Sequence, residues 1–267
     1  MIEVFPGPRE LTEADVEQLY AYPEGERWLA VNFVSSADGG ITVQGRSRGL
    51  STPADRVVYR LGSDLADVVL LGAGTAVAEE FDGIHPDEQT AERRRRHGLS
   101  PVPPIAVVST GRSLPPDAPV LTRPLVPTIV LTGAATDPDL RAAWTEAGAE
   151  VIVAGAGEPE LHAAADRQTS VTEPRPPARA GDVDLTAALA ALAAQGLRRI
   201  DCEGGPHLFA ALLAAGLVDE LRLTLSPMLV AGDAARVAMG VPIEPKHLDL
   251  QSMLIEDSTV LLRYLVR

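Results

Sequence analysis

Residues 199–215, RIDCEGGPHLFAALLAA, join a short apolar strand to a helix rich in alanine and leucine through a pair of glycines. An apolar run followed by turn residues predicts a buried strand over Arg199–Cys202 and a helix from His207 to Ala215. Pro206 suits the first turn of that helix, where its missing N–H leaves no hydrogen bond unmade. The segment therefore predicts one strand–turn–helix unit of a parallel α/β sheet, with Glu203 at the carboxyl end of the strand.

The same alternation of short apolar runs and helical patterns extends over most of the chain. The strands that it predicts are Trp28–Ser35, Asp67–Leu71, Ile105–Ser109, Thr128–Leu131 and Glu150–Val153. The helices that it predicts are Pro53–Leu61, Glu88–His97, Pro138–Ala147 and Leu185–Ala194. The last third differs, because it contains an alternating strand and then two further segments with two residues between them, which is typical of an antiparallel hairpin. These last three segments are Glu220–Leu225, Leu248–Glu256 and Thr259–Val266.

We therefore expect an α/β protein with a mixed, mostly parallel central sheet, helices on its faces and a C-terminal antiparallel hairpin. Residues 1–27 carry one amphipathic stretch, Glu10–Tyr20, and are predicted to form an N-terminal appendage to a single domain over residues 28–267. The polar, proline-rich stretch Asp166–Asp182 has no apolar period and is predicted to be an exposed loop of that domain.

Composition excludes several classes of protein. The 267 residues contain 23 Lys and Arg against 37 Asp and Glu, a net charge of −14, which excludes a broadly basic nucleic-acid binder. The run Arg93–Arg96 is accordingly interpreted as one solvated helix face. Cys202 is the single cysteine and the five histidines lack the spacing of zinc ligands, so we expect no disulfide and no metal site. No signal peptide and no apolar run of the ~20 residues that span a bilayer is present, which predicts a cytoplasmic protein.

Three further segments place small or polar residues where a predicted strand ends, the edge at which open α/β sheets bind ligands. In residues 31–40, VNFVSSADGG, Ser36 and Asp38 reach this edge, although Asp38 could instead cap its own turn. In residues 68–79, VVLLGAGTAVAE, a Gly-x-Gly turn precedes a helix predicted to start at Thr75, whose free N–H groups would favour a diphosphate. The alternative is a plain strand–helix connection, because Val77 replaces the third glycine of the classical dinucleotide motif.

The third segment is Ser109-Thr110-Gly111-Arg112, after the strand Ile105–Ser109. A hydroxyl pair and a guanidinium at this place could hold an adenosine 2′-phosphate and so favour NADP over NAD, or they could form a solvent-facing loop. Glu203 would point into the same cleft, where the alternative role is that of an ordinary helix cap. Cys202 is interpreted as a small buried hydrophobe, and His207 on its own as a helix-surface residue.

In this order, the segments SSADGG, LSTPADR, LLGAGTAVAEE and CEGGPHLFAAL resemble the C-terminal reductase domain of bacterial riboflavin biosynthesis, the 5-amino-6-(5-phosphoribosylamino)uracil reductase family. The resemblance extends from about Trp28 to the C-terminus. It implies a dihydrofolate-reductase-like fold, NADPH as cofactor, a phosphorylated pyrimidine or pterin as substrate, and a homodimer. The zinc-deaminase motif that precedes this domain in bifunctional relatives is absent from the sequence.

The resemblance also implies roles for individual residues. Glu203 and Asp38 would be the catalytic acids. The cofactor would be bound by Gly72, Gly74, Thr75, Glu79, Ser109, Arg112, Gly204, Gly205, Pro206, His207 and Leu208. The substrate would be bound by Asn32, Ser36, Ser47, Arg56, Arg60 and Glu203.

Two positions depart from the family pattern. Asn32 stands where the family often has Lys, and Ser63 lies near the place of an Arg that helps to hold the substrate phosphate. A guanidinium clamp is not replaced by an amide or a hydroxyl, so the identity of the substrate stays open. The leading hypothesis is reduction of a pyrimidine ribosylamine 5′-phosphate. The alternatives are reduction of dihydrofolate or another pterin, and a non-catalytic protein that binds NADPH or a related ligand.

Overall fold

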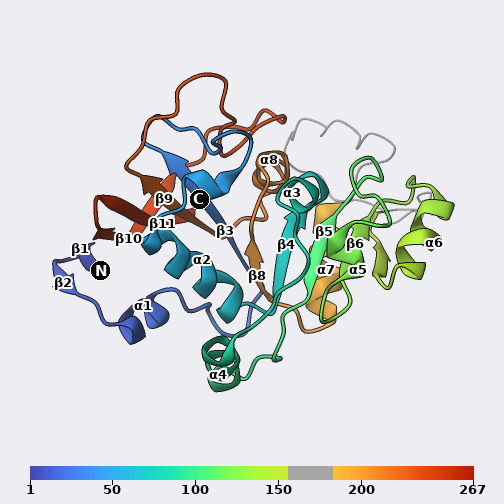
Figure 1. Cartoon of the computed structure of the whole chain (residues 1–267), viewed down its shortest axis with the longest axis horizontal. Helices are drawn as coiled ribbons and strands as arrows, with labels where there is room; N and C mark the ends of the chain where they lie inside the picture. Colours follow the sequence, from blue (N-terminus) through green and yellow to red (C-terminus); the bar gives the residue numbers. More distant parts are fainter. Residues whose placement is uncertain (156–182) are drawn as a thin grey trace, which may run out of the picture.

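The computed structural model describes residues 1–155 and 183–267, so the predicted loop Asp166–Asp182 lies outside the described residues. The described strands form an 11-stranded sheet in the order β2-β1-β10-β11-β9-β3-β8-β4-β5-β6-β7 (Figure 1). They are β1 (Ile2–Phe5), β2 (Arg9–Glu10), β3 (Trp28–Ser36), β4 (Val68–Gly72), β5 (Ile105–Val108), β6 (Ile129–Thr132), β7 (Glu150–Val153), β8 (Arg199–Cys202), β9 (Glu220–Ser226), β10 (Leu248–Glu256) and β11 (Thr259–Val266). The helices are α1 (Glu13–Leu19), α2 (Pro53–Leu65), α3 (Ala73–Ala78), α4 (Glu88–Arg96), α5 (Pro119–Thr122), α6 (Pro138–Glu146), α7 (Leu185–Ala194) and α8 (Pro206–Ala214), with a 3₁₀ turn η1 (Ser47–Gly49).

The sheet changes character at β9. From β9 through β3, β8, β4, β5 and β6 to β7, every pair of neighbours is parallel. From β9 outward through β11, β10 and β1 to β2, every pair is antiparallel. The expected fold class, a mostly parallel sheet flanked by helices and closed by a C-terminal hairpin, is thus confirmed. The parallel part supplies the strand ends at which ligands bind.

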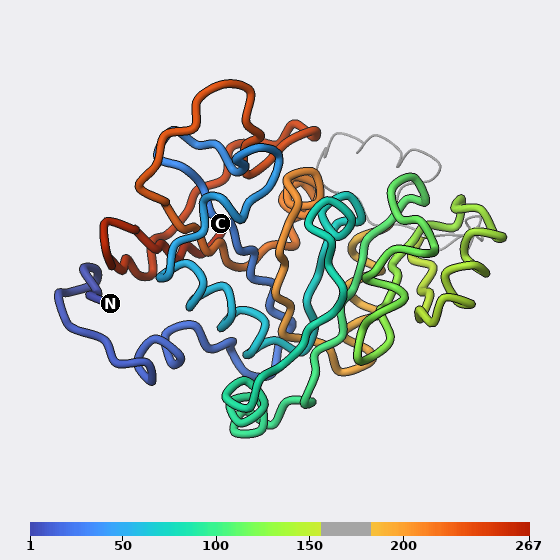
Figure 2. Tube along the Cα trace, viewed as in Figure 1, coloured from blue at the N-terminus to red at the C-terminus, as the bar shows by residue number. Residues whose placement is uncertain are grey.

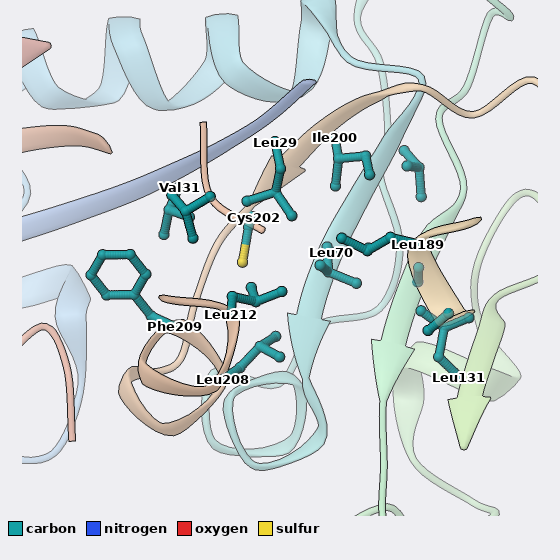
Figure 3. Packing of buried hydrophobic residues seen from close by; sticks show 14 of the residues in the cluster. Leu29, Val31, Leu70, Leu131, Leu189, Ile200, Cys202, Leu208, Phe209 and Leu212 are labelled. Atoms are coloured by element: carbon teal, nitrogen blue, oxygen red, sulfur yellow. The ribbon is translucent and has the colours of Figure 1, made fainter. Parts of the chain in front are cut away.

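Buried aliphatic side chains fill both faces of the parallel strands. Figure 3 shows one such cluster, in which Leu29, Leu70 and Cys202 of the sheet pack with Leu208 and Leu212 of α8. A second cluster covers the opposite face with α3, α5 and α6. Cys202 is fully buried in the first cluster, in agreement with its interpretation as a small hydrophobe.

Several helix boundaries differ from those predicted. The helix expected to start at Thr75 starts at Ala73, because Gly72 is its N-cap and the turn is shorter than the glycine pattern indicated. The helix expected to end at Leu61 continues to Leu65, where Ala66 takes an extended conformation. Its start is as predicted, since Thr52 caps it and Pro53 opens it.

The N-terminal residues join the sheet rather than lying apart from it. β1 pairs with β10, so the first residues of the chain run beside its last strands, as the trace in Figure 2 shows. Val16 and Tyr20, which belong to or follow α1, are buried in a third apolar cluster with Leu61 of α2. Residues 1–27 therefore contribute both strands and core to the same body.

The arginine run Arg93–Arg96 does not form one solvated face, so that prediction is wrong. Successive residues of an α-helix point about 100° apart, and four in a row therefore cover every side of the helix. Arg93 and Arg94 are buried, and only the last two are exposed. Arg93 pairs with Asp64 of α2 and with Glu17 of α1. The run thus fastens α4 to α2 and α1.

No helix among the described residues is long and apolar enough to cross a membrane. Nor do the described His, Cys, Asp and Glu side chains form a group of three or more that could hold a metal ion.

Candidate active site

A cleft of about 2330 Å³ opens at the carboxyl ends of the parallel strands. Its walls come from β3, from the segment η1–α2, and from the β4–α3 and β8–α8 turns. A drug-sized ligand typically occupies a pocket of roughly 300–1,000 Å³. The cleft is therefore large enough for two ligands side by side.

Most of the residues expected to bind ligand come together here. Of the expected residues, those that line the cleft are Asn32, Ser47, Arg56, Arg60, Gly72, Gly74, Thr75, Glu79, Ser109, Glu203, Gly205, Pro206, His207 and Leu208. Ser63, the position noted for its missing guanidinium, lines it as well. Ser36, Asp38, Arg112 and Gly204 do not line it.

Asp38 and Ser36 face a separate hollow of about 380 Å³ behind the strand end. Asp38 accepts a hydrogen bond from the Ser36 hydroxyl, and from the backbone N–H groups of Val230 at 3.2 Å and Ala231 at 2.8 Å. These bonds, that from Ser36 first, lower the pKa of Asp38. The carboxylate thus ties the turn after β3 to the loop after β9. It caps a distant segment outside the main cleft, where the resemblance implied a catalytic acid and the alternative interpretation was a cap for its own turn.

Two glycine turns touch at the floor of the cleft. The Gly72 N–H donates to the Gly204 carbonyl at 2.9 Å, which joins the turn after β4 to the turn after β8. Gly204 has φ +82° and a Cβ there would lie 3.1 Å from the ring of Phe33, so both backbone and space require glycine. Gly204 and Gly205 are joined by a cis peptide. The turns approach this closely because they lack side chains.

Helices α3 and α8 both start in this floor without a capping side chain. In α2, α4 and α7 the N-cap side chain accepts a hydrogen bond from the backbone, whereas α3 and α8 follow Gly72 and Gly205 and have none. Their first N–H groups remain available to a ligand, and the dipole of the nine-residue α8 favours an anion. These two turns could hold the diphosphate of a dinucleotide.

Ser47, expected to bind the substrate, and Glu79, expected to bind the cofactor, hydrogen-bond to each other. The Glu79 carboxylate accepts from the Ser47 backbone N–H at 2.9 Å and from its hydroxyl at 3.0 Å. The bonds connect η1, on the α2 side of the cleft, to the end of α3. The two walls of the cleft are therefore held in register.

Arginines stand along the rim near α2. Arg56 donates to the Ser51 carbonyl at 3.1 Å, and Arg60 pairs with Asp87 at 3.4 Å. Arg48 also lines the cleft, and among the described residues it has no ion pair. Arg48 was missed from the sequence, although it lies next to Ser47. A phosphate group would find its counter-charges here.

Glu203 lies at the inner end of the cleft. Burial raises the pKa of its carboxyl well above the usual range, the nearby charge of Asp201 raises it further, and a hydrogen bond with Asn32 opposes both effects. Asn32 thus touches the candidate acid at the position where a lysine was expected. The site therefore presents a carboxyl group with a raised pKa beside the uncapped start of α8.

Residues 27–261 match the model of the RibD C-terminal domain. The chain belongs to the RibD C-terminal domain family. As a member of this reductase family it belongs among the pyrimidine reductases of riboflavin biosynthesis, which use a nicotinamide cofactor. The family predicted from the ordered motifs is confirmed.

Two archaeal relatives align with this chain over most of their own length. It is 28% identical over 207 residues, 77% of this chain and 82% of the relative, to the 2,5-diamino-6-ribosylamino-4(3H)-pyrimidinone 5′-phosphate reductase of Archaeoglobus fulgidus. It is 27% identical over 210 residues, 78% of this chain and 82% of the relative, to the protein of the same name from Methanothermobacter thermautotrophicus.

Solved structures share the fold of this RibD-family reductase. A pyrimidine reductase-like protein from Corynebacterium diphtheriae has a TM-score of 0.72 at 22% identity, and covers 96% of this chain and 99% of its own. A riboflavin biosynthesis reductase of Saccharomyces cerevisiae has a TM-score of 0.60 at 14% identity, and covers 94% of this chain and 98% of its own. At these identities the likeness extends to the architecture alone.

Proposed function

We propose that this protein uses NADPH to reduce the ribosyl group of a pyrimidine ribosylamine 5′-phosphate to a ribityl chain. The observation that carries the proposal is the juxtaposition, in one cleft, of two uncapped helix starts and a buried carboxyl group, Glu203. The first can hold a diphosphate, and the second can protonate a nitrogen during reduction.

The residues present fit a dinucleotide. The glycine turns before α3 and α8 both line the cleft, and Gly205 lets them pack together, since a Cβ on Gly205 would lie 2.4 Å from the Thr75 hydroxyl oxygen. When bound, NADPH would supply the hydride. Ser109, at the edge of the cleft, accepts a hydrogen bond from the Gly111 N–H at 3.1 Å and so fixes the loop that carries Arg112. Arg112 is exposed, and we propose that it meets the 2′-phosphate that distinguishes NADPH from NADH.

The α2 side of the cleft suits the phosphorylated substrate. Arg48, Arg56 and Arg60 gather positive charge at its rim, in a protein whose net charge of −14 otherwise repels phosphate. Asn32 and Glu203 lie deeper, where the reacting end of the substrate would reach. The three arginines would then replace the single phosphate-binding arginine expected near Ser63.

Opening of the ribosyl ring leaves an imine between C1′ and the attached nitrogen. Reduction forms a C–H bond at C1′ with the incoming hydride, and the electron pair of the C=N bond moves onto nitrogen. One proton must arrive at that nitrogen, and we propose that Glu203 gives it and regains it from solvent. Each turnover therefore consumes one NADPH and one proton.

The experiment is an assay of NADPH oxidation with three substrates. These are the 2,5-diaminopyrimidinone ribosylamine 5′-phosphate, its 5-amino-uracil counterpart, and dihydrofolate. We expect turnover with the ribosylamine phosphates, the diamino compound first because the archaeal relatives carry its name. Turnover with dihydrofolate alone would establish a pterin reductase instead, and NADPH binding without any turnover would establish a binding protein.

We also propose that the protein is a homodimer. Ile2, Val4 and Phe5 of β1 are large, exposed apolar side chains on one short strand near the edge of the sheet, and a second copy could cover them. Sedimentation of the purified protein tests this, and a monomer at micromolar concentration would contradict it.

A further inference from the structure

Asp201 and Glu203 are alternate residues at the end of β8. Side chains two residues apart on a strand point to the same face, so both carboxyl groups point away from the cluster that buries Cys202. Glu203 lines the cleft, whereas Asp201 is fully buried behind it. An ionisable group inside a four-residue core strand, two residues before the candidate acid, has no role in the proposed ligand contacts.

Helix α2 lies directly on Asp201. A Cβ at Gly62 would be 2.7 Å from both carboxyl oxygens of Asp201, so only glycine lets the helix approach this closely. The Tyr22 hydroxyl donates to the Gly62 carbonyl at 3.4 Å and closes the same space from the N-terminal segment. Bulk water therefore has no access to the Asp201 carboxyl.

The two carboxyl groups, which point to the same face from alternate positions, interact, since each shifts the pKa of the other. If both were ionised, neither could donate, and both oxygens of Asp201 and Oε1 of Glu203 would be buried without a partner in the described part of the chain. Two adjacent buried carboxylates also repel each other strongly. A single shared proton removes the repulsion and joins one oxygen of each carboxyl group in a hydrogen bond.

The surroundings determine which residue keeps the negative charge. Burial raises the pKa of Asp201, whereas the positive charge of the buried Arg222 guanidinium favours its ionised form. Glu203 has no such cation and contacts the Asn32 amide and the cleft. The titratable groups that face the pair from the neighbouring elements are Tyr22, Asp55, Tyr59, Glu220 and Arg222.

We propose that Asp201 is a positioning residue that shares one proton with Glu203 and holds that proton on Glu203 in the neutral pH range. Glu203 then meets its ligand as a hydrogen-bond donor and proton source, while Asp201 carries the charge in the interior. The proton sharing stands on the geometry of the ligand-free protein. Its use in turnover rests on the proposed function.

The first test needs no substrate. In protein labelled with ¹³C at the glutamate carboxyl carbons, we expect one glutamate to remain protonated at pH 7, and its signal to disappear in Glu203→Gln. In Asp201→Asn the repulsive charge is gone and the new amide can donate to the Glu203 carboxylate, so the midpoint of that titration falls by at least about one pH unit. A wild-type Glu203 ionised at pH 7, or an unmoved midpoint in Asp201→Asn, overturns the proposal.

The second test is the pH dependence of NADPH oxidation. Because the acid must be protonated, activity is lost as the pH rises through the midpoint of the pair, and Asp201→Asn moves this alkaline limb to lower pH by a similar amount. A merely structural defect lowers the rate at every pH and leaves the limb in place.

The control variant is Asp219→Asn. Asp219 is a partly buried aspartate outside the cleft that accepts a hydrogen bond from the Leu29 N–H at 2.7 Å. Its replacement should therefore leave the alkaline limb of the pH profile unmoved. If Asp201→Asn does not fold, the wild-type and Glu203→Gln spectra still decide the question. If Glu203 is protonated but the protein turns over none of the three substrates, the proposed function is refuted and the proposal of a shared proton stands.

Discussion

The Cα of Gly205 faces the hydroxyl of Thr75, and a Cβ on Gly205 would lie 2.4 Å from Thr75 Oγ1. The β8–α8 and β4–α3 turns therefore touch at a point where no side chain fits. This contact fixes the two helix starts that are proposed to hold the cofactor diphosphate.

Gly205→Ala should weaken NADPH binding by at least about tenfold, because the turns must separate to admit the methyl group. Titration calorimetry measures the dissociation constant. Gly7→Ala, where a Cβ meets nothing within 4 Å, is the control and should bind normally. Thr75→Ala in the Gly205→Ala background removes the clash and should restore part of the thermal stability; no recovery would contradict the contact as the cause.

Glu203→Gln should retain NADPH binding and lower kcat by about 10²- to 10⁴-fold. Glutamine keeps the shape and can still donate a hydrogen bond, but it has no proton to give. Single-turnover kinetics with bound NADPH isolate the chemical step. A rate equal to that of the wild type would remove Glu203 from the mechanism.

Arg48→Ala should raise KM for the phosphorylated substrate by roughly tenfold or more, since a charge-assisted hydrogen bond to phosphate contributes about 1.5–3 kcal/mol. The effect should shrink with added salt. Arg46→Ala is the matched control, because Arg46 pairs with Glu80 at 3.2 Å and does not line the cleft. Equal changes in both variants would show that the effect is a general loss of positive charge.

Arg94→Met should lower the free energy of unfolding by about 3 kcal/mol. The Arg94 guanidinium donates to the carbonyls of Ser63 and Ala66, each at 2.9 Å, and of Ser100 at 2.6 Å, and methionine would remove all three of these bonds. Urea denaturation measures the loss. Arg95→Met, at an exposed position on the same helix, should change stability by less than about 0.5 kcal/mol.

Glu220 should make the protein sensitive to acid. Burial alone would raise the pKa of Glu220, but the charges of Arg222 and Arg263 outweigh it and lower the pKa from 4.5 to about 2. A carboxylate with a depressed pKa stabilises the folded state above the unfolded value, and this stability is lost as the pH falls from about 4.5 to about 2. In the wild type, the denaturation midpoint should decrease as the pH is lowered through this window. In Glu220→Gln, which is less stable throughout, this slope should be reduced.

Local sequence patterns predicted the elements that lie in the parallel sheet. β7, β8 and α7 have the predicted bounds, because a short apolar run between turn residues is a local signal for a strand or its helix. Strand β1 was not predicted, since Ile2–Phe5 becomes a strand only by pairing with β10 at the other end of the chain. Such pairing leaves no local signal.

The same limit applies to the polar residues. The residues next to Arg93 in the sequence do not indicate that it forms ion pairs with Asp64 and Glu17. Likewise, the residues next to Asp38 do not indicate that its carboxylate accepts a hydrogen bond from Val230. Asp201 did carry a signal that was not used: a charged residue in a short core strand, in phase with Glu203. The alternation of side chains along a strand can be seen from neighbouring residues, whereas Arg222 and Tyr22, which lie near Asp201 in the fold, are far from it in the sequence.

Helix α2 carries Arg56 and Arg60 at the mouth of the cleft and Gly62 against the Asp201 carboxyl, less than two turns away. An α-helix moves as a stiff rod over such a distance, and α4 clamps the far end of this one through Arg94. A substitution that tilts α2 should therefore change two proposed properties together, the affinity for the substrate phosphate and the pH at which the Asp201–Glu203 pair loses its proton. In this fold both depend on the position of one helix.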